Sequence, residues 1–228
     1  MFGLKTKIFS LLQKKPSKKI ANESRIFELM KHFQEDEYGH EANIKTADLG
    51  YGWVHYGLIR QLRPKRVLCI GSRHGYIPGV LAQACYDNNQ GRVDYIDAGF
   101  GLDDKQNWTG EGFWRTKKGK QTFQKIGLDN FISLHVTTTK KFAKDYPDVF
   151  YDYIYIDGDH SYQGVKFDYD TYWSKLRKGG YMVFHDVCVK GTKPEGEYGV
   201  WKLWNKLEKK NNIIKITYTE SGLGIIQK

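Results

Sequence analysis

The chain has 228 residues, of which 40% are hydrophobic, enough for one domain with a large core and too many for a globally disordered protein. No apolar run approaches the roughly 20 residues of a membrane-spanning helix. The formal net charge is +10, but residues 1–20 contain six lysines and no acid, which leaves 10 − 6 = +4 for the remainder. The basic charge therefore belongs largely to a tail, and nucleic acid is not an expected partner.

This basic tail has an apolar stretch at residues 8–12 that is too short for a secretory signal. A solvated or partner-docked tail is favoured, because the apolar spacing is imperfect for an amphipathic helix. Peripheral contact with an anionic membrane surface through the tail stays open. The three cysteines, Cys69, Cys85 and Cys188, have neither C-x-x-C nor zinc spacing, which predicts reduced thiols in a cytoplasmic protein.

Two helices are expected before the first strand. Residues 22–33 carry apolar side chains on one helical face, and residues 47–62 combine apolar spacing with a cluster of aromatic residues. Pro64 then separates the second helix from the first strand. We expect residues 21–228 to form a single domain in which residues 21–63 are a helical cover.

The chain is organised around a strand, a glycine turn and a helix. Residues 67–70 form a continuous apolar run, as in a strand buried on both faces of a parallel sheet. The run ends in Gly71, and a helical pattern begins after Gly75. Such a turn brings backbone N–H groups and a positive helix terminus against a ligand. The glycine spacing is not the G-x-G-x-x-G of dinucleotide-binding proteins.

The second strand, residues 92–97, contains two acids. Asp97 ends the strand, where ligands gather in open α/β sheets, so we prefer it to Asp94 as an acceptor for ribose hydroxyls. A solvated strand end is the alternative for either residue. Residues 98–120 are rich in Gly, Trp and Asp and predict either a functional loop or a merely packed one.

The rest of the chain continues the β/α alternation and closes with a hairpin. Further strands are expected at residues 131–136, 152–157 and 181–186. Helices are expected after Ser161 and through residues 200–207, and the closing hairpin at residues 213–218 and 223–226. The pattern predicts an α/β fold with a doubly wound sheet and helices on both faces.

Three motifs together resemble class I S-adenosylmethionine (SAM)-dependent methyltransferases. They are the glycine turn, the run YIDGDHSY at residues 155–162, and the run LRKGGYMVFHD at residues 176–186. The last two are similar to a bacterial subgroup of small-molecule O-methyltransferases related to catechol-type and cephalosporin-type enzymes. The resemblance covers roughly residues 47–190 and implies a Rossmann-like sheet of seven strands, mostly parallel, with an antiparallel last strand.

The resemblance also implies where SAM would bind. The expected cofactor contacts lie in the glycine turn, at the end of the second strand, in the turn after the third strand and after the fourth; they are Gly71, Ser72, Gly75, Tyr76, Asp97, Thr138 and Asp157.

In the metal-dependent members of this family, one acid after the fourth strand and two polar residues after the fifth hold a magnesium ion. Those positions are Asp157, His185 and Asp186 here. His185 departs from the family, which usually has an oxygen ligand there. The departure leaves three alternatives open. The site could bind Mg²⁺, it could bind Mn²⁺ or another transition metal, or it could bind no metal at all.

His160 lies three residues past Asp157, where the catechol-type relatives place a catalytic lysine. A histidine with a near-neutral pKa could take the hydroxyl proton during methyl transfer. The alternative is that His160 only caps or packs the helix that comes after it.

The predicted function is therefore methyl transfer from SAM to a hydroxyl of a small molecule, such as a sugar or a secondary metabolite. An RNA methyltransferase is one alternative, although no Asn/Asp-Pro-Pro-aromatic motif occurs. A noncatalytic protein of the same fold that docks through its basic tail is another.

Overall fold

The structure is a computed structural model that describes residues 23–33, 40–101, 103–104, 111–193, 196–209, 212–217 and 219–228. The basic tail and its expected contacts lie outside the described residues, as does part of the aromatic loop of residues 98–120. The division into tail and domain therefore stays a prediction. Among the described residues, no helix has the length and apolarity that crossing a membrane requires.

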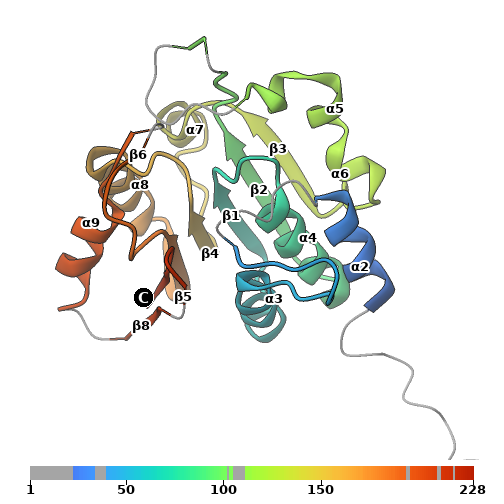
Figure 1. The fold of residues 1–228 in the computed structure, drawn as a ribbon, viewed down its shortest axis with the longest axis horizontal. Coiled ribbons are helices and arrows are strands. Elements are labelled where there is room, and N and C mark those ends of the chain that lie inside the picture. The colour runs from blue at the N-terminus through green and yellow to red at the C-terminus, as the bar shows by residue number, and fades with distance from the viewer. Residues whose placement is uncertain are drawn as a thin grey trace, which may run out of the picture.

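The elements alternate as the sequence predicts (Figure 1). The strands are β1 Arg66–Ile70, β2 Arg92–Asp97, β3 Ile132–Val136, β4 Tyr151–Ile156, β5 Leu176–His185, β6 Gly191–Lys193, β7 Gly196–Tyr198, β8 Ile213–Ile216 and β9 Leu223–Gln227. The helices are α2 Glu23–His32, α3 Tyr51–Leu62, α4 Tyr76–Asn88, the 3₁₀ turn η2 Phe113–Arg115, α5 Lys117–Lys120, α6 Thr122–Lys125, α7 Thr139–Asp145, α8 Tyr162–Trp173 and α9 Val200–Leu207.

Seven of the strands form one sheet in the order β3-β2-β1-β4-β5-β9-β8. The pairs among β1 to β5 are parallel, and β9 runs antiparallel to both of its neighbours. The predicted mostly parallel, seven-stranded sheet with an antiparallel last strand is confirmed.

Helices cover both faces of this sheet (Figure 1). One hydrophobic core joins the sheet to α2, α3 and α4, and the other joins it to α7, α8 and α9. Because both faces are buried, the parallel strands can be apolar almost throughout; residues 67–70 have at most 2% of their surface exposed.

The strand order reverses between β1 and β4, which are neighbours in the sheet. The chain leaves β1 for β2 on one side and later enters β4 on the other. In open α/β sheets, ligands bind at the carboxyl ends of the strands beside such a reversal. The glycine turn follows β1 and Asp157 follows β4, so both motifs lie at this point.

The structure differs from the sequence prediction before α3, between β2 and β4, and around β5. The helices α5, α6 and α7 were not predicted, and β5 begins at Leu176 rather than at the expected residue 181. The expected helix of residues 47–62 begins only at Tyr51, because Ala47 and Gly50 have positive φ angles of 55° and 54°, which a right-handed helix cannot include. The short hairpin of β6 and β7 was not predicted. Strands of three residues carry too little periodicity to detect.

Candidate active site

A compact group of acidic and histidine side chains lies at the carboxyl ends of β4 and β5. Asp157 follows β4, His160 comes three residues later, His185 ends β5 and Asp186 follows it. His185 and Asp186 are 5% and 6% exposed. The structure therefore brings these four residues together, and their roles stay predictions.

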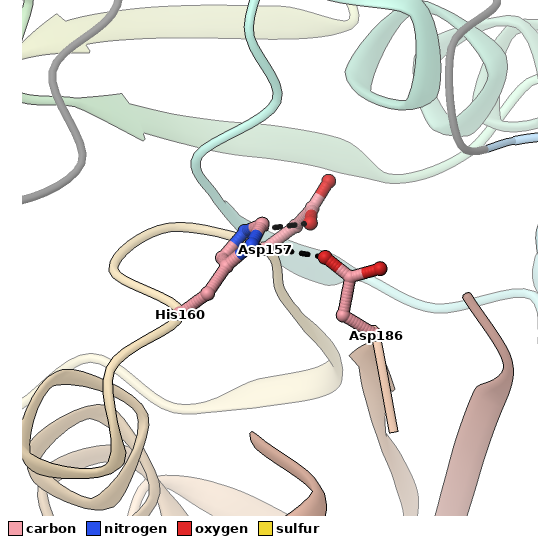
Figure 2. A group of neighbouring side chains, drawn as sticks. All are labelled: Asp157, His160 and Asp186. Atoms are coloured by element: carbon pink, nitrogen blue, oxygen red, sulfur yellow. Dashed lines mark ion pairs between the residues drawn. The ribbon is translucent and has the colours of Figure 1, made fainter. Parts of the chain in front are cut away.

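His160 lies between the two carboxylates, as Figure 2 shows. Its Nε2 is 3.3 Å from Asp157 Oδ1, and its Nδ1 is 2.9 Å from Asp186 Oδ2. Donor atoms of these three residues all lie within 4.8 Å of one another. The three side chains therefore form a group that could hold a metal ion. The sequence placed His185, rather than His160, in this set.

His185 contacts the same carboxylates through a single ring nitrogen. Its Nδ1 is 3.2 Å from Asp157 Oδ1 and 3.4 Å from Asp186 Oδ1. Its ring also packs edge-on against the ring of Tyr51. When its ring is protonated, His185 can therefore orient both carboxylates by ion pairing.

His40 also belongs to the cluster, which the sequence did not indicate. It is 4% exposed, its ring centroid lies 4.7 Å from that of His185, and its Nε2 is 3.9 Å from Asp157 Oδ2. Its Nδ1 is buried with no hydrogen-bond partner among the described residues. The backbone fixes its place, since His40 O accepts a hydrogen bond from Tyr51 N. No motif or periodicity marks residue 40 as part of a site.

Mutual pairing controls the charges in the cluster. Burial alone would raise the pKa of Asp157, but His185 and His160 lower it well below 3.8, and the pKa of Asp186 is lowered for the same reason. Burial alone would lower the pKa of His160, but its bonds with both carboxylates raise it to about 10. The pKa of His185 is also raised, whereas burial and the neighbouring His185 lower that of His40 to about 4.

The pKa of His160 in the structure differs from the near-neutral pKa that the sequence analysis expects. With both ring nitrogens paired to carboxylates and a pKa of about 10, His160 as it lies here is protonated at neutral pH. A protonated imidazole cannot accept a proton from a substrate. The geometry therefore gives no support to His160 as a free general base.

The glycine turn after β1 brings its backbone close to the cluster. Gly71 has a φ of 69°, and a Cβ there would lie 2.2 Å from Asp157 O, so only glycine fits without a shift. Ser72 and Arg73 also have positive φ angles, 145° and 28°. Strained residues of this kind cluster at ligand sites.

The residues present fit the SAM that the sequence leads us to expect. Ser72 is 3% exposed, and its Oγ is buried with no hydrogen-bond partner among the described residues. Asp97 is half-buried at the end of β2 and accepts hydrogen bonds from Gly99 N at 2.7 Å and the Tyr95 hydroxyl at 3.1 Å. Burial raises the pKa of Asp97 to about 6. An unpaired hydroxyl and a poorly solvated carboxylate are groups that a polar ligand would stabilise.

Two other expected cofactor contacts, Tyr76 and Thr138, form hydrogen bonds that stabilise the fold. Tyr76 is buried and donates its hydroxyl to Leu49 O at 2.8 Å, which ties α4 to the segment that carries His40. Thr138 accepts a hydrogen bond from Lys141 N and so caps α7. Their roles toward a cofactor stay predictions.

Part of the aromatic segment of residues 98–120 packs on the glycine turn. Trp114 is 1% exposed and donates its indole N–H to Arg73 O at 2.9 Å. A Cβ at Gly75 would lie 2.8 Å from the Trp114 ring. Glu111 pairs with Arg73 at 3.6 Å and with His74 at 3.5 Å. This segment therefore contacts the turn at Arg73, His74 and Gly75, whereas Asp157 lies against Gly71.

A parallel sheet with a glycine turn after its first strand and an acid at the end of its second defines the Rossmann-like class of α/β proteins. The comparisons with known proteins give the family. The family model described as a methyltransferase domain matches residues 68–187, more than half of the chain, and the chain belongs to this family.

Among curated proteins, the chain is similar to y4gI of Sinorhizobium fredii, with 26% identity over 184 residues. The match covers 76% of this chain but only 19% of y4gI, so the chain spans about a fifth of that relative.

Solved structures share the fold. An O-methyltransferase from Bacillus cereus in complex with SAH is 13% identical with a TM-score of 0.60, over 98% of this chain and 96% of that one. The O-methyltransferase TomG from Streptomyces achromogenes in complex with SAM is 16% identical with a TM-score of 0.59, over 96% and 93%.

Proposed function

We propose that this methyltransferase transfers a methyl group from SAM to a hydroxyl of a small molecule, such as a sugar or a secondary metabolite. The observation that carries the proposal is the buried carboxylate–imidazole cluster beside the glycine turn, at the reversal of strand order. The two similar structures named above, which are O-methyltransferases with SAM or SAH bound, support the same activity.

The residues of the glycine turn would bind the methionine half of SAM. Gly71 and Gly75 keep the backbone free of side chains there, and Ser72 offers its buried hydroxyl. Asp97 would accept hydrogen bonds from both ribose hydroxyls, and Thr138 lies in the turn after β3, where we expect the adenine. Together these residues would hold the methyl donor in one orientation.

Asp157 and Asp186, with a histidine, would hold a divalent metal ion. A bound ion would lower the pKa of the acceptor hydroxyl and fix its oxygen. The side chains of Asp157 and Asp186 are 7% and 8% exposed, so the carboxylates that would hold the ion are largely buried. In the transfer, the acceptor oxygen would form the new O–C bond as the C–S bond of SAM breaks. The electron pair of that bond would stay on the sulfur of SAH, and the hydroxyl proton would be lost to solvent.

The test uses the 228-residue protein and measures both cofactor binding and methyl transfer. Calorimetry should detect binding of SAH, and SAM with a labelled methyl group should pass its label to hydroxylated sugars or aromatic metabolites, with one SAH formed per methyl transferred. Label on RNA instead would favour the RNA-methyltransferase alternative. Failure to bind either SAM or SAH would overturn the proposal. A cytoplasmic location stays a prediction from the cysteines.

A further inference from the structure

We infer that His160 is itself a ligand of the metal ion, together with Asp157 and Asp186, and that this ligand set selects a transition metal over Mg²⁺. The inference rests on the proposed function and names the ion and the histidine that the sequence left open. It assigns His160 to the metal, where the family resemblance would make it the general base.

The positions of the donor atoms carry the assignment. Among the described residues, the group whose donor atoms converge within 4.8 Å consists of Asp157, His160 and Asp186. Metal–ligand bonds of about 2.0–2.2 Å put the ligand atoms of one ion roughly 3–4 Å apart. An imidazole binds an ion through one nitrogen. With Nε2 as that atom, its 3.3 Å to Asp157 Oδ1 is within this spacing, and Nδ1 lies 2.9 Å from Asp186 Oδ2 on the other side of the ring.

The pairing of both ring nitrogens of His160 also fits a ligand. When one imidazole nitrogen binds an ion, the other commonly donates its N–H to a carboxylate, which fixes the ring. His160 has a carboxylate at each nitrogen, so whichever nitrogen binds the ion leaves the other with a partner. His160 is also largely buried, with 17% of its side chain exposed.

His185 has the geometry of a supporting residue. A single nitrogen, Nδ1, faces both Asp157 Oδ1 and Asp186 Oδ1, from 3.2 and 3.4 Å. Its ring packs against the rings of His40 and Tyr51, with centroids 4.7 and 6.1 Å away. Such outer residues orient the ligands and tune affinity without binding the ion.

The chemistry of the ligand set decides the class of ion. Mg²⁺ prefers an octahedron of oxygen ligands and keeps several waters. Imidazole suits Fe²⁺, Ni²⁺, Cu²⁺ and Zn²⁺, and affinity at a mixed nitrogen and oxygen site rises from Mn²⁺ through Fe²⁺, Co²⁺ and Ni²⁺ to Cu²⁺. One imidazole and two carboxylates therefore favour a transition metal. A bound imidazole has no free lone pair, so it cannot take the proton of the acceptor.

The experiment uses full-length protein stripped of metal and titrated with Co²⁺ or Mg²⁺. Cobalt is the probe because its visible absorption reports ligation, and protons on a coordinated ring give strongly shifted NMR signals. We expect Co²⁺ to bind at least about 100-fold more tightly than Mg²⁺. The wild-type protein should show one shifted imidazole N–H that exchanges with solvent.

Three variants locate that signal. His160→Gln should remove it and weaken Co²⁺ binding, and added free imidazole should restore part of the absorption. His185→Gln should weaken binding about 10- to 100-fold but keep the signal. His135→Gln is the matched control, because His135 pairs with the carboxylate of Asp94 at 3.0 Å outside the cluster, and it should change nothing.

Several outcomes would overturn the inference. The first two are equal affinity for Mg²⁺ and Co²⁺, and no binding of Co²⁺ at all. The third is a number of shifted imidazole N–H signals other than one in the wild-type protein. The fourth is a shifted signal that is lost in His185→Gln and kept in His160→Gln. The wild-type count does not depend on the folding of any variant. SAH binding measured in the presence of chelator separates the two proposals. If SAH binds equally well without metal, the proposed cofactor site is supported even when the metal assignment fails.

Discussion

Asp97 offers a sharp test of the cofactor site, because its replacement should affect binding and stability in opposite directions. The side chain ends β2 and accepts hydrogen bonds from Gly99 N and the Tyr95 hydroxyl. We consider Asp97→Asn, which keeps the shape and one acceptor oxygen but removes the charge. If Asp97 binds the ribose of SAM, the variant loses two charged hydrogen bonds to the ligand.

The expected effect on stability follows from the pKa of Asp97. Burial raises this pKa to about 6 in the folded protein, against 3.8 ordinarily. At about 1.4 kcal/mol per pH unit, ionised Asp97 destabilises the fold by about 3 kcal/mol. The destabilisation is absent below pH 3.8, grows up to pH 6 and is complete above it. Asp97→Asn removes this destabilisation, although weaker hydrogen bonds to Gly99 and Tyr95 offset part of the stability gained. The unfolding midpoint at pH 7 should therefore stay equal or rise.

The expected effect on binding has the opposite sign. Hydrogen bonds to a charged group contribute roughly 1.5–3 kcal/mol, so Asp97→Asn should weaken SAH binding about 10- to 150-fold at pH 7. Ribose hydroxyls donate to the ionised form of Asp97. Below pH 6, binding must also deprotonate the carboxyl group, and wild-type affinity should fall about fivefold from pH 6 to pH 5. The variant should lose this pH dependence.

Calorimetry with SAH at several pH values, together with thermal unfolding, measures both effects. The control is Asp94→Asn in the same strand, where Asp94 pairs with Arg66 at 2.7 Å and His135 at 3.0 Å. This control should lower the unfolding midpoint and leave SAH affinity unchanged. Wild-type affinity that does not vary between pH 5 and 7, or an Asp97→Asn variant that binds as tightly as wild type, would refute the reasoning.

Three further substitutions test the glycine turn. Gly71→Ala should destabilise the fold by about 2 kcal/mol or more, because its Cβ would meet Asp157 O at 2.2 Å, and an unchanged thermal midpoint would contradict this. Ser72→Ala should weaken SAH binding about fivefold in calorimetry without lowering the midpoint, since its buried Oγ has no partner among the described residues. Trp114→Phe loses the hydrogen bond to Arg73 O and should cost about 1 kcal/mol of SAH binding; equal affinity would show that the bond does not shape the turn.

The fold could be predicted because its signals are local. Residues 67–70 are apolar at every position, as expected of a parallel strand that is buried on both faces of the sheet. A glycine turn and a helical period follow directly. Asp97, Asp157 and Asp186 each follow or end such a strand. Since parallel strands end at one edge of the sheet, finding the strands also finds these carboxylates.

His40 could not be predicted, because its place depends on contacts that are distant in sequence. The segment that carries it is held by Tyr51 N, which donates to His40 O, and by Tyr76, whose hydroxyl binds Leu49 O. Gly50 permits the turn between them with a φ of 54°, and a Cβ there would lie 2.1 Å from His40 O. None of these contacts leaves a pattern near residue 40.

The choice between His160 and His185 is also a matter of backbone geometry. Adjacent residues of a regular strand point to opposite faces, so His185 and Asp186 could not both face Asp157 if β5 simply continued. The positive φ of 57° at Asp186 ends the strand and turns its carboxylate toward His160. His185 Nδ1 then lies near both of the same carboxylates. Because this turn depends on a single backbone angle, the sequence could indicate the two carboxylates and both histidines, but not which histidine lies between the carboxylates.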